Sequence, residues 1–216
     1  DKSNELAKFS KMMDQAMANK EAYSSQVTSL KASQTALNAE LAAYKKNKIE
    51  ASYDQINASF AAARKSLESG DGYKAIYDQV YQQVLIAAVQ NAMDQSGTKT
   101  TVTADNVNHL LSQMGNAGDE IKKAAAQTAE TTTKQQAEKQ LESIPADAKD
   151  ALDHPDKLTA MQDMLKQQGQ ADAAKNLTKK NLQTMYDIVN TRIPQINTEL
   201  ANLKIKIKTA EAVLAQ

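Results

Sequence analysis

Apolar residues in the first fifth of the chain recur at alternating spacings of four and three positions. The average of 3.5 residues is the period of a coiled coil, and it keeps a narrow apolar seam on one side of a helix. The members of this N-terminal seam are Phe9, Met13, Ala16, Lys20, Tyr23, Val27, Leu30, Gln34, Leu37, Leu41 and Tyr44. The spacing predicts a helix that packs lengthwise against another helix.

The pattern shifts by one residue after Tyr44 and then resumes. The second series consists of Ile49, Tyr53, Ile56, Phe60, Ala63 and Leu67, and no Gly or Pro occurs between Glu5 and Glu68. We therefore expect one helix over residues 5–68, roughly 95 Å long at 1.5 Å per residue. The shift is predicted to alter the supercoil without ending the helix. The sequence SGDG, residues 69–72, is predicted to end it.

The end of the chain carries a matching C-terminal seam. Its members are Leu182, Tyr186, Val189, Ile193, Ile196, Leu200, Leu203, Ile207, Ala210 and Leu214. Pro194 lacks a backbone N–H and clashes with the preceding turn, so a kink is expected near Asn190–Ile193. Ile205, within the alternating stretch KIKIK, is predicted to lie on the flank of the seam.

Two seams of equal period are natural antiparallel partners within one chain. Burial of each large apolar side chain contributes roughly 1.5–3 kcal/mol. The alternative is that the seams bind a helix of another molecule.

The middle of the chain divides into shorter elements, since residues 72–169 hold five of the six glycines. Residues 73–94 are apolar around most of a helix and are predicted to be buried. Shorter helices are expected between Thr103 and Gly115 and between Pro155 and Gly169. Residues 119–143 contain few large apolar side chains, so we expect an exposed and mobile helix there.

These patterns predict an all-α protein. The expected architecture is an elongated antiparallel bundle, or coiled coil, of long N- and C-terminal helices with a small helical appendage. Residues 1–69 would form the first long helix, residues 70–170 an appendage of about four short helices, and residues 171–216 the last helix, all in one structural unit.

Charge and composition narrow the range of partners. The chain has 26 basic and 26 acidic residues and no cysteine. A balanced charge argues against nucleic acid, since phosphate binding requires a surplus of Lys and Arg. The longest apolar run, VLIAAV at Val84–Val89, is far shorter than the roughly 20 residues that span a bilayer. We expect protein partners and no integral membrane segment.

No motif predicts chemistry. His154 lies beside Asp150, Asp153 and Asp156, but the spacing of zinc and calcium motifs is absent, and aspartates beside a proline are typical of helix caps. Nucleophile turns and phosphate-binding loops are also absent. We expect no catalytic, cofactor-binding or metal-binding residues and no enzymatic activity.

Tyr73, Tyr77 and Tyr81 are the candidate protein-contact residues. Their spacing of four places the three rings on one face of a helix. Tyrosine is enriched in protein interfaces. The alternative is that the rings pack at the edge of the core with their hydroxyls in water.

The chain begins at Asp1 rather than Met, and we expect an exported protein whose leader has been removed. The alternative is a sequence trimmed for another reason. A lipid-anchoring cysteine before Asp1 would also be compatible with this start.

Two stretches carry a resemblance of layout. The stretch ELAKFSKMMDQAMANKEAYSSQVTSLKASQTALNAELAAY resembles the long first helix of the minor pilus subunits of type IV secretion and conjugation systems, and INTELANLKIKIKTAEAVLAQ resembles their last helix. The resemblance implies an exported, helical subunit at a pilus tip that contacts other subunits, recipient cells or host receptors. No functional residue is carried over from the family.

Two other classes share this layout. Type III needle-tip and filament proteins pair their end helices in an intramolecular coiled coil, and periplasmic helical lipoproteins or chaperone-like proteins are a further alternative. A helical pore-forming toxin is disfavoured, because VLIAAV is too short for an insertion hairpin.

Overall fold

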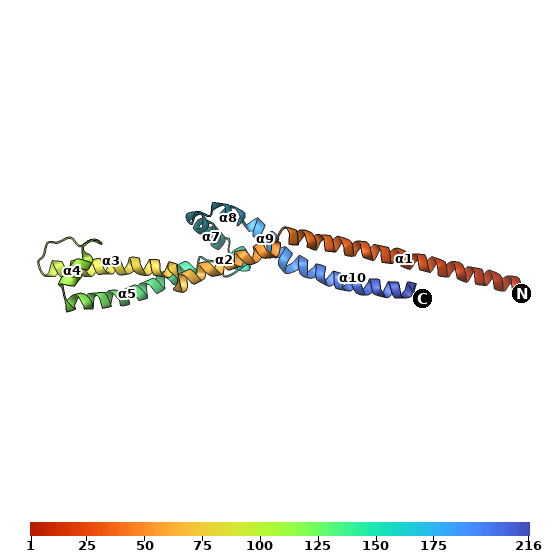
Figure 1. Ribbon diagram of the computed structural model, residues 1–216, viewed down its shortest axis with the longest axis horizontal. Coiled ribbons are helices and arrows are strands. Elements are labelled where there is room, and N and C mark those ends of the chain that lie inside the picture. The colour runs from red at the N-terminus through yellow and green to blue at the C-terminus, as the bar shows by residue number, and fades with distance from the viewer. The chain divides into compact units, whose positions relative to one another are not determined.

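The computed structural model describes all residues 1–216, and every regular element in it is a helix (Figure 1). This confirms the predicted all-α class. The helices are α1 (Lys2–Lys46), α2 (Ile49–Ser69), α3 (Asp71–Gln95), α4 (Val107–Gln113), α5 (Asn116–Leu141), α6 (Ala148–Asp153), α7 (Pro155–Gln167), α8 (Ala171–Asn176), α9 (Lys179–Asp187), a π-helical segment η1 (Ile188–Arg192) and α10 (Ile193–Leu214).

The chain forms two compact units. The first consists of Asp1–Asp54 with Leu182–Gln216, and the second consists of Gln55–Asn181. This division differs from the predicted segments 1–69, 70–170 and 171–216, because α2 and α9 each contribute to both units.

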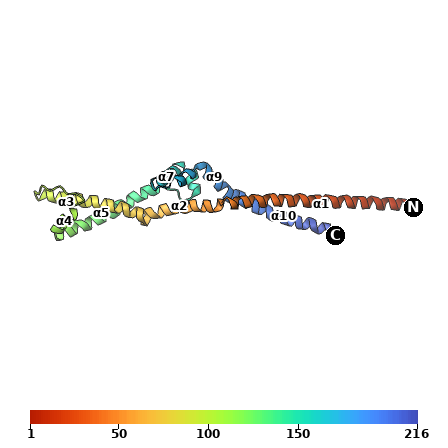
Figure 2. The same cartoon turned by 45° about the horizontal axis from the view of Figure 1, so that its top comes forward.

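In the first unit α1 and α10 lie side by side and run antiparallel, as both ribbon views show (Figures 1 and 2). Their contact follows the two predicted seams, whose members are less exposed than their neighbours. On α1 these are Val27, Leu30, Gln34, Leu37, Leu41 and Tyr44; on α10 they are Ile193, Ile196, Leu200, Leu203, Ile207, Ala210 and Leu214. Ile205 is 65 % exposed, as its predicted place on the flank requires. The two seams thus pair within the chain over this length.

The prediction of a single helix over residues 5–68 is wrong. α1 ends at Lys46, and Lys48 has a φ of 54°, a left-handed conformation that does not continue an α-helix. The Asn47 N–H donates to the Ala43 carbonyl and so closes the last turn of α1. The break coincides with the shift in the apolar pattern between Tyr44 and Ile49, so this shift marks the end of a helix rather than a change of supercoil.

The irregularity predicted near Asn190–Ile193 takes the form of a π-helical turn. The segment η1 spans Ile188–Arg192 and ends two residues before Pro194. Pro194 has no N–H to donate to the Asn190 carbonyl, so the regular hydrogen-bond pattern is interrupted there. A single π turn is one of the irregularities by which an α-helix accommodates such an interruption.

In the second unit α3 and α5 pack against each other along their length. The apolar helix predicted over residues 73–94 is α3, and its Leu85 and Val89 are buried together with Val107 and Leu111 of α4 and Ala125 of α5. The second half of α2 joins the same unit through buried Phe60 and Leu67.

The prediction of an exposed helix over residues 119–143 is wrong. Four small side chains at spacings of four are buried on one face of α5, namely Ala125, Ala129, Thr133 and Ala137. Small residues let two helix backbones approach closely, so α5 packs without large apolar side chains.

Candidate functional site

The paired part of the N-terminal seam ends near Val27. Val27 is the only buried residue of α1, and Lys31 forms an ion pair of 2.8 Å with Glu211 in the last turn of α10. α10 ends at Leu214, whereas α1 continues from Gln26 back to Lys2 beside no other helix of its unit (Figures 1 and 2). Every residue from Asp1 to Gln26 is exposed.

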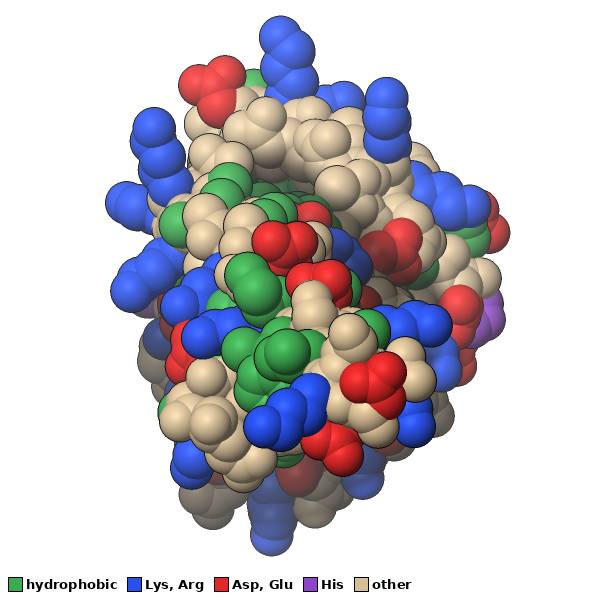
Figure 3. Space-filling view, turned by 90° about the vertical axis from the view of Figure 1, so that its right-hand side faces the viewer, with side chains coloured by type: hydrophobic (Ala, Val, Ile, Leu, Met, Phe, Trp, Pro, Cys, Tyr) green, Lys and Arg blue, Asp and Glu red, His purple; other side chains and the backbone are tan.

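This exposed part of α1 has the composition of a contact surface. Its large apolar residues are 40–68 % exposed, and they are Leu6, Phe9, Met12, Met13, Met17 and Tyr23. We call these six residues the α1 stripe. Figure 3 views the molecule from the end that carries the α1 N-terminus and shows hydrophobic side chains at the surface among charged ones. Large apolar side chains exposed together on one face of a helix mark interaction sites in soluble proteins.

The α1 stripe continues the heptad phase of the paired seam. Leu6, Phe9, Met13 and Tyr23 occupy core positions of the coiled-coil repeat, in register with Val27. Met12 and Met17 flank the core positions and widen the apolar face. Methionine adapts its shape to a partner because its side chain is unbranched and polarizable. The arrangement is therefore suited to a helical partner.

The apolar periodicity predicts Phe9, Met13 and Tyr23 as part of a seam, favours pairing of that seam within the chain and leaves a helix of another molecule as the alternative. Leu6, Met12 and Met17 lie outside the predicted series. The relative length of the two seams distinguishes pairing within the chain from pairing with another molecule. The N-terminal seam and its second series extend over residues 9–67, whereas the C-terminal seam extends only over residues 182–214. An antiparallel partner of that length cannot cover the whole of the longer seam.

The predicted contact residues Tyr73, Tyr77 and Tyr81 lie on α3 and are half-buried. The Tyr77 and Tyr81 rings stack with centroids 6.0 Å apart, and Tyr81 packs against the core of the second unit. Burial, followed by the neighbouring Tyr81 and the Glu130 carboxylate, raises the pKa of Tyr77. The three side chains therefore share one face, and part of that face is occupied by packing against α3's own unit.

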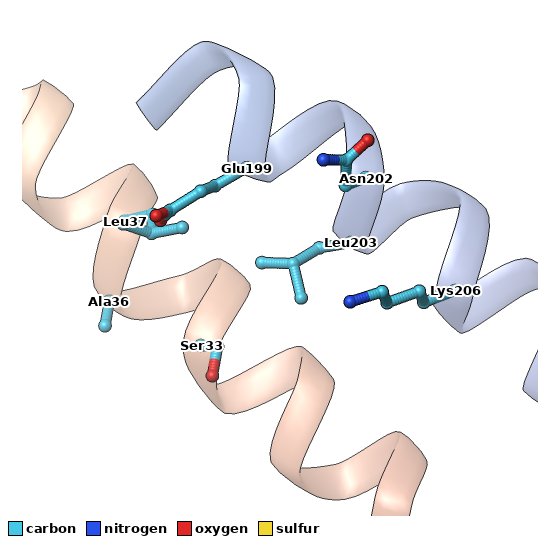
Figure 4. A pocket seen from close by; sticks show the side chains of 7 residues that line it. All are labelled: Ser33, Ala36, Leu37, Glu199, Asn202, Leu203 and Lys206. Carbon is cyan, nitrogen blue, oxygen red and sulfur yellow. The ribbon is translucent and has the colours of Figure 1, made fainter. Parts of the chain in front are cut away.

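A groove of about 460 Å³ lies between α1 and α10 (Figure 4). Leu37 and Leu203 project into it from the two helices, and Glu199 and Lys206 lie at its sides. The groove is part of the coiled-coil surface and has the mixed polar and apolar lining of a helix pair.

The helix cap predicted for the aspartates beside His154 is made by Asp147 at the start of α6, and no side chain caps the start of α7. The Asp147 carboxylate accepts from the Asp150 N–H at the start of α6. The Asp150 carboxylate in turn accepts from the Ala146 N–H and Lys157 Nζ and lies 3.0 Å from His154 Nδ1. No cluster of three His, Asp or Glu side chains suited to a metal ion occurs in the structure.

None of the helices is both long and apolar enough to cross a membrane. Comparisons with known protein families, with characterised proteins and with solved structures found no match for this chain.

Proposed function

We propose that the protein is a non-enzymatic, exported component that binds other proteins, and that it serves as a minor pilus or adhesin subunit of a type IV secretion apparatus. The α1 stripe is the observation that carries this proposal. Burial of its six large apolar side chains against a partner would contribute roughly 1.5–3 kcal/mol each. A long first helix paired with the last helix is the layout that resembles minor pilus subunits. This resemblance is the reason for proposing a type IV secretion apparatus in particular.

The pairing of α1 with α10 supports an alternative as well. Type III needle-tip proteins join their end helices in a coiled coil, and this protein does the same over Val27–Tyr44. A pilus subunit is recovered with sheared surface appendages and copurifies with the major pilus subunit. A needle-tip protein copurifies with needle complexes, and a periplasmic protein remains with the cell envelope.

Deletion of the gene tests the proposal. Transfer of DNA or effectors should fall, and complementation with the wild type should restore it. Complementation with Met13→Asp, in the α1 stripe, should fail, whereas Ala18→Asp should succeed, because Ala18 lies on the opposite, outward face of α1. Normal transfer without the protein would refute the proposed function.

A further inference from the structure

We propose that a second copy of this chain covers the α1 stripe, so that residues 6–23 of two copies pack antiparallel as a coiled coil. The inference rests on the role of the stripe as a protein-contact surface. It adds the identity of the partner, the direction of the two helices and their register.

Continuity with the α1–α10 interface points to a helical partner. From Leu6 through Tyr23 to Val27 the core positions of the heptad repeat continue without a gap, although α10 covers α1 only as far as Val27. A helix of another molecule, placed in line with α10 beyond its C-terminal end, would therefore meet core positions of the same heptad repeat on α1. Residues 6–23 extend over about 27 Å, or roughly five turns.

The stripe is complementary to itself when the two copies are antiparallel. In an antiparallel coiled coil, a residue at heptad position a of one helix faces a residue at position d of the other helix. Leu6 then faces Tyr23 of the second copy, and Met13 faces Ala16 of the second copy. Each layer of the dimer thus contains two side chains that differ in size or shape. A two-fold axis through the centre of the interface relates the layers of one half to those of the other.

Lys20 favours the antiparallel direction over the parallel one. It is the only charged residue at a core position between Leu6 and Tyr23. In a parallel pair the Lys20 side chains of the two copies would face each other, and their like charges would repel. In the antiparallel pair Lys20 faces the Phe9 ring of the second copy, which attracts a cation. Glu5 of the second copy lies one turn further and supplies a carboxylate.

The position of α10 favours the same direction. In a parallel pair both copies would reach Val27 together, and the two α10 helices would compete for the space along the seams. In the antiparallel pair the interface ends at Tyr23 of each copy, and the α10 helices lie beyond its opposite ends. Residues 6–23 therefore pair without displacing α10, while residues 1–5 of each copy reach the level of Ser24–Thr28 on the other copy and pass beside the last turn of its α10.

Sedimentation of the full chain over a concentration series tests the association. The mass of the wild type should double as concentration rises, and Ala18→Asp should behave in the same way. Met13→Asp places two charges in the central layers of the dimer, so its transition should move to a concentration at least about tenfold higher. Met13 touches no part of α10, so all three proteins should melt alike at low concentration. A wild type that stays monomeric, or a dimer unaffected by Met13→Asp, would overturn the proposal.

The absence of cysteine makes the direction testable by disulfide formation. Leu6→Cys and Tyr23→Cys, prepared separately, should form a disulfide-linked dimer only when they are mixed. A rapid disulfide in Leu6→Cys alone would show parallel helices and overturn the antiparallel register.

Failure of this proposal can be told apart from failure of the proposed function. A monomeric protein whose Met13→Asp variant still loses binding to a major pilus subunit would exclude the second copy and leave the pilus role in place. A dimer formed through the stripe, together with normal transfer in the deletion strain, would exclude the pilus role and support the dimer. A monomer that binds vesicles of neutral lipid through the stripe would overturn the dimer.

Discussion

The Arg192 guanidinium on η1 binds both carboxylate oxygens of Glu40 on α1. Its Nη2 lies 3.0 Å from Oε1, and its Nε donates to Oε2. The hydrogen bonds to Arg192 lower the pKa of Glu40, and those to Glu40 raise the pKa of Arg192. A slip of α10 along α1 by one heptad would preserve the apolar seam but separate this pair. The ion pair therefore selects one register among those that the seam allows.

Arg192→Lys tests the bidentate geometry. Lysine keeps the charge but cannot bond both oxygens, so the free energy of unfolding should fall, and only slightly because the pair is partly exposed. Thermal unfolding of Arg192→Lys, Glu40→Gln and the double variant gives the coupling between the two residues. If the effect of the double variant equals the sum of the two single effects, the interaction between Arg192 and Glu40 does not contribute to stability.

Leu200→Asp tests the seam itself. Leu200 is half-buried on the face of α10 that packs against α1, and an aspartate there loses the apolar contact and brings a charge into the seam. We expect a loss of about 2–4 kcal/mol, typical of an unpaired charge at a packed position. Ala201→Asp adds the same charge on the exposed face and should leave the melting temperature almost unchanged. An unchanged melting temperature for Leu200→Asp would contradict the pairing of the two seams.

The paired seams could be predicted because a heptad repeat depends on few positions of the sequence. Val27, Ile196 and Ile207 are buried where the spacing places them. The end of α1 was missed, since neither Asn47 nor Lys48 is a strong helix breaker and the left-handed φ of Lys48 is not encoded by a Gly or Pro.

The packing of α5 could not be predicted from apolar periodicity. Ala129 and Thr133 carry too little apolar surface to produce a pattern, and their burial depends on how closely α3 approaches. The exposure of Leu6 and Phe9 could not be predicted either, although the apolar periodicity is clear there. Periodicity shows that a helix has a contact face, but it does not show which molecule covers that face.

Gly118→Ala tests the close approach of α4 to α5. A Cβ at Gly118 would lie 2.3 Å from the Leu111 carbonyl oxygen, so the two helices would have to separate. We expect a loss of about 1–3 kcal/mol, as is usual for overpacking. Helix propensity alone predicts a gain of about 1 kcal/mol, so the sign of the change is decisive. Ala117→Ser at the exposed neighbouring position is the control for thermal unfolding.

Thr133→Val should stabilise the second unit. Thr133 is fully buried, and its hydroxyl has no hydrogen-bond partner. Valine has nearly the same shape and removes the unsatisfied group, so the free energy of unfolding should rise by about 1 kcal/mol. Thr131→Val is the matched control, because that hydroxyl is exposed and donates to the Gln127 carbonyl. A loss of stability in Thr133→Val, measured by urea unfolding, would show that the hydroxyl is bonded in solution.

Asp150 should make stability depend on pH in the acid range. The Ala146 N–H and then Lys157 lower the pKa of Asp150 from 3.8 to about 2. Because the folded protein holds the proton less tightly than the unfolded chain, the carboxylate stabilises the fold above pH 3.8, and this contribution is lost as the pH falls through about 2. The wild type should therefore exceed Asp150→Asn in stability at pH 7, and the difference should shrink towards pH 2. Asp153→Asn, at an exposed position of α6, should match the wild type at pH 7. A difference between the wild type and Asp150→Asn that persists unchanged at pH 2 would mean that shape rather than charge makes Asp150 stabilising.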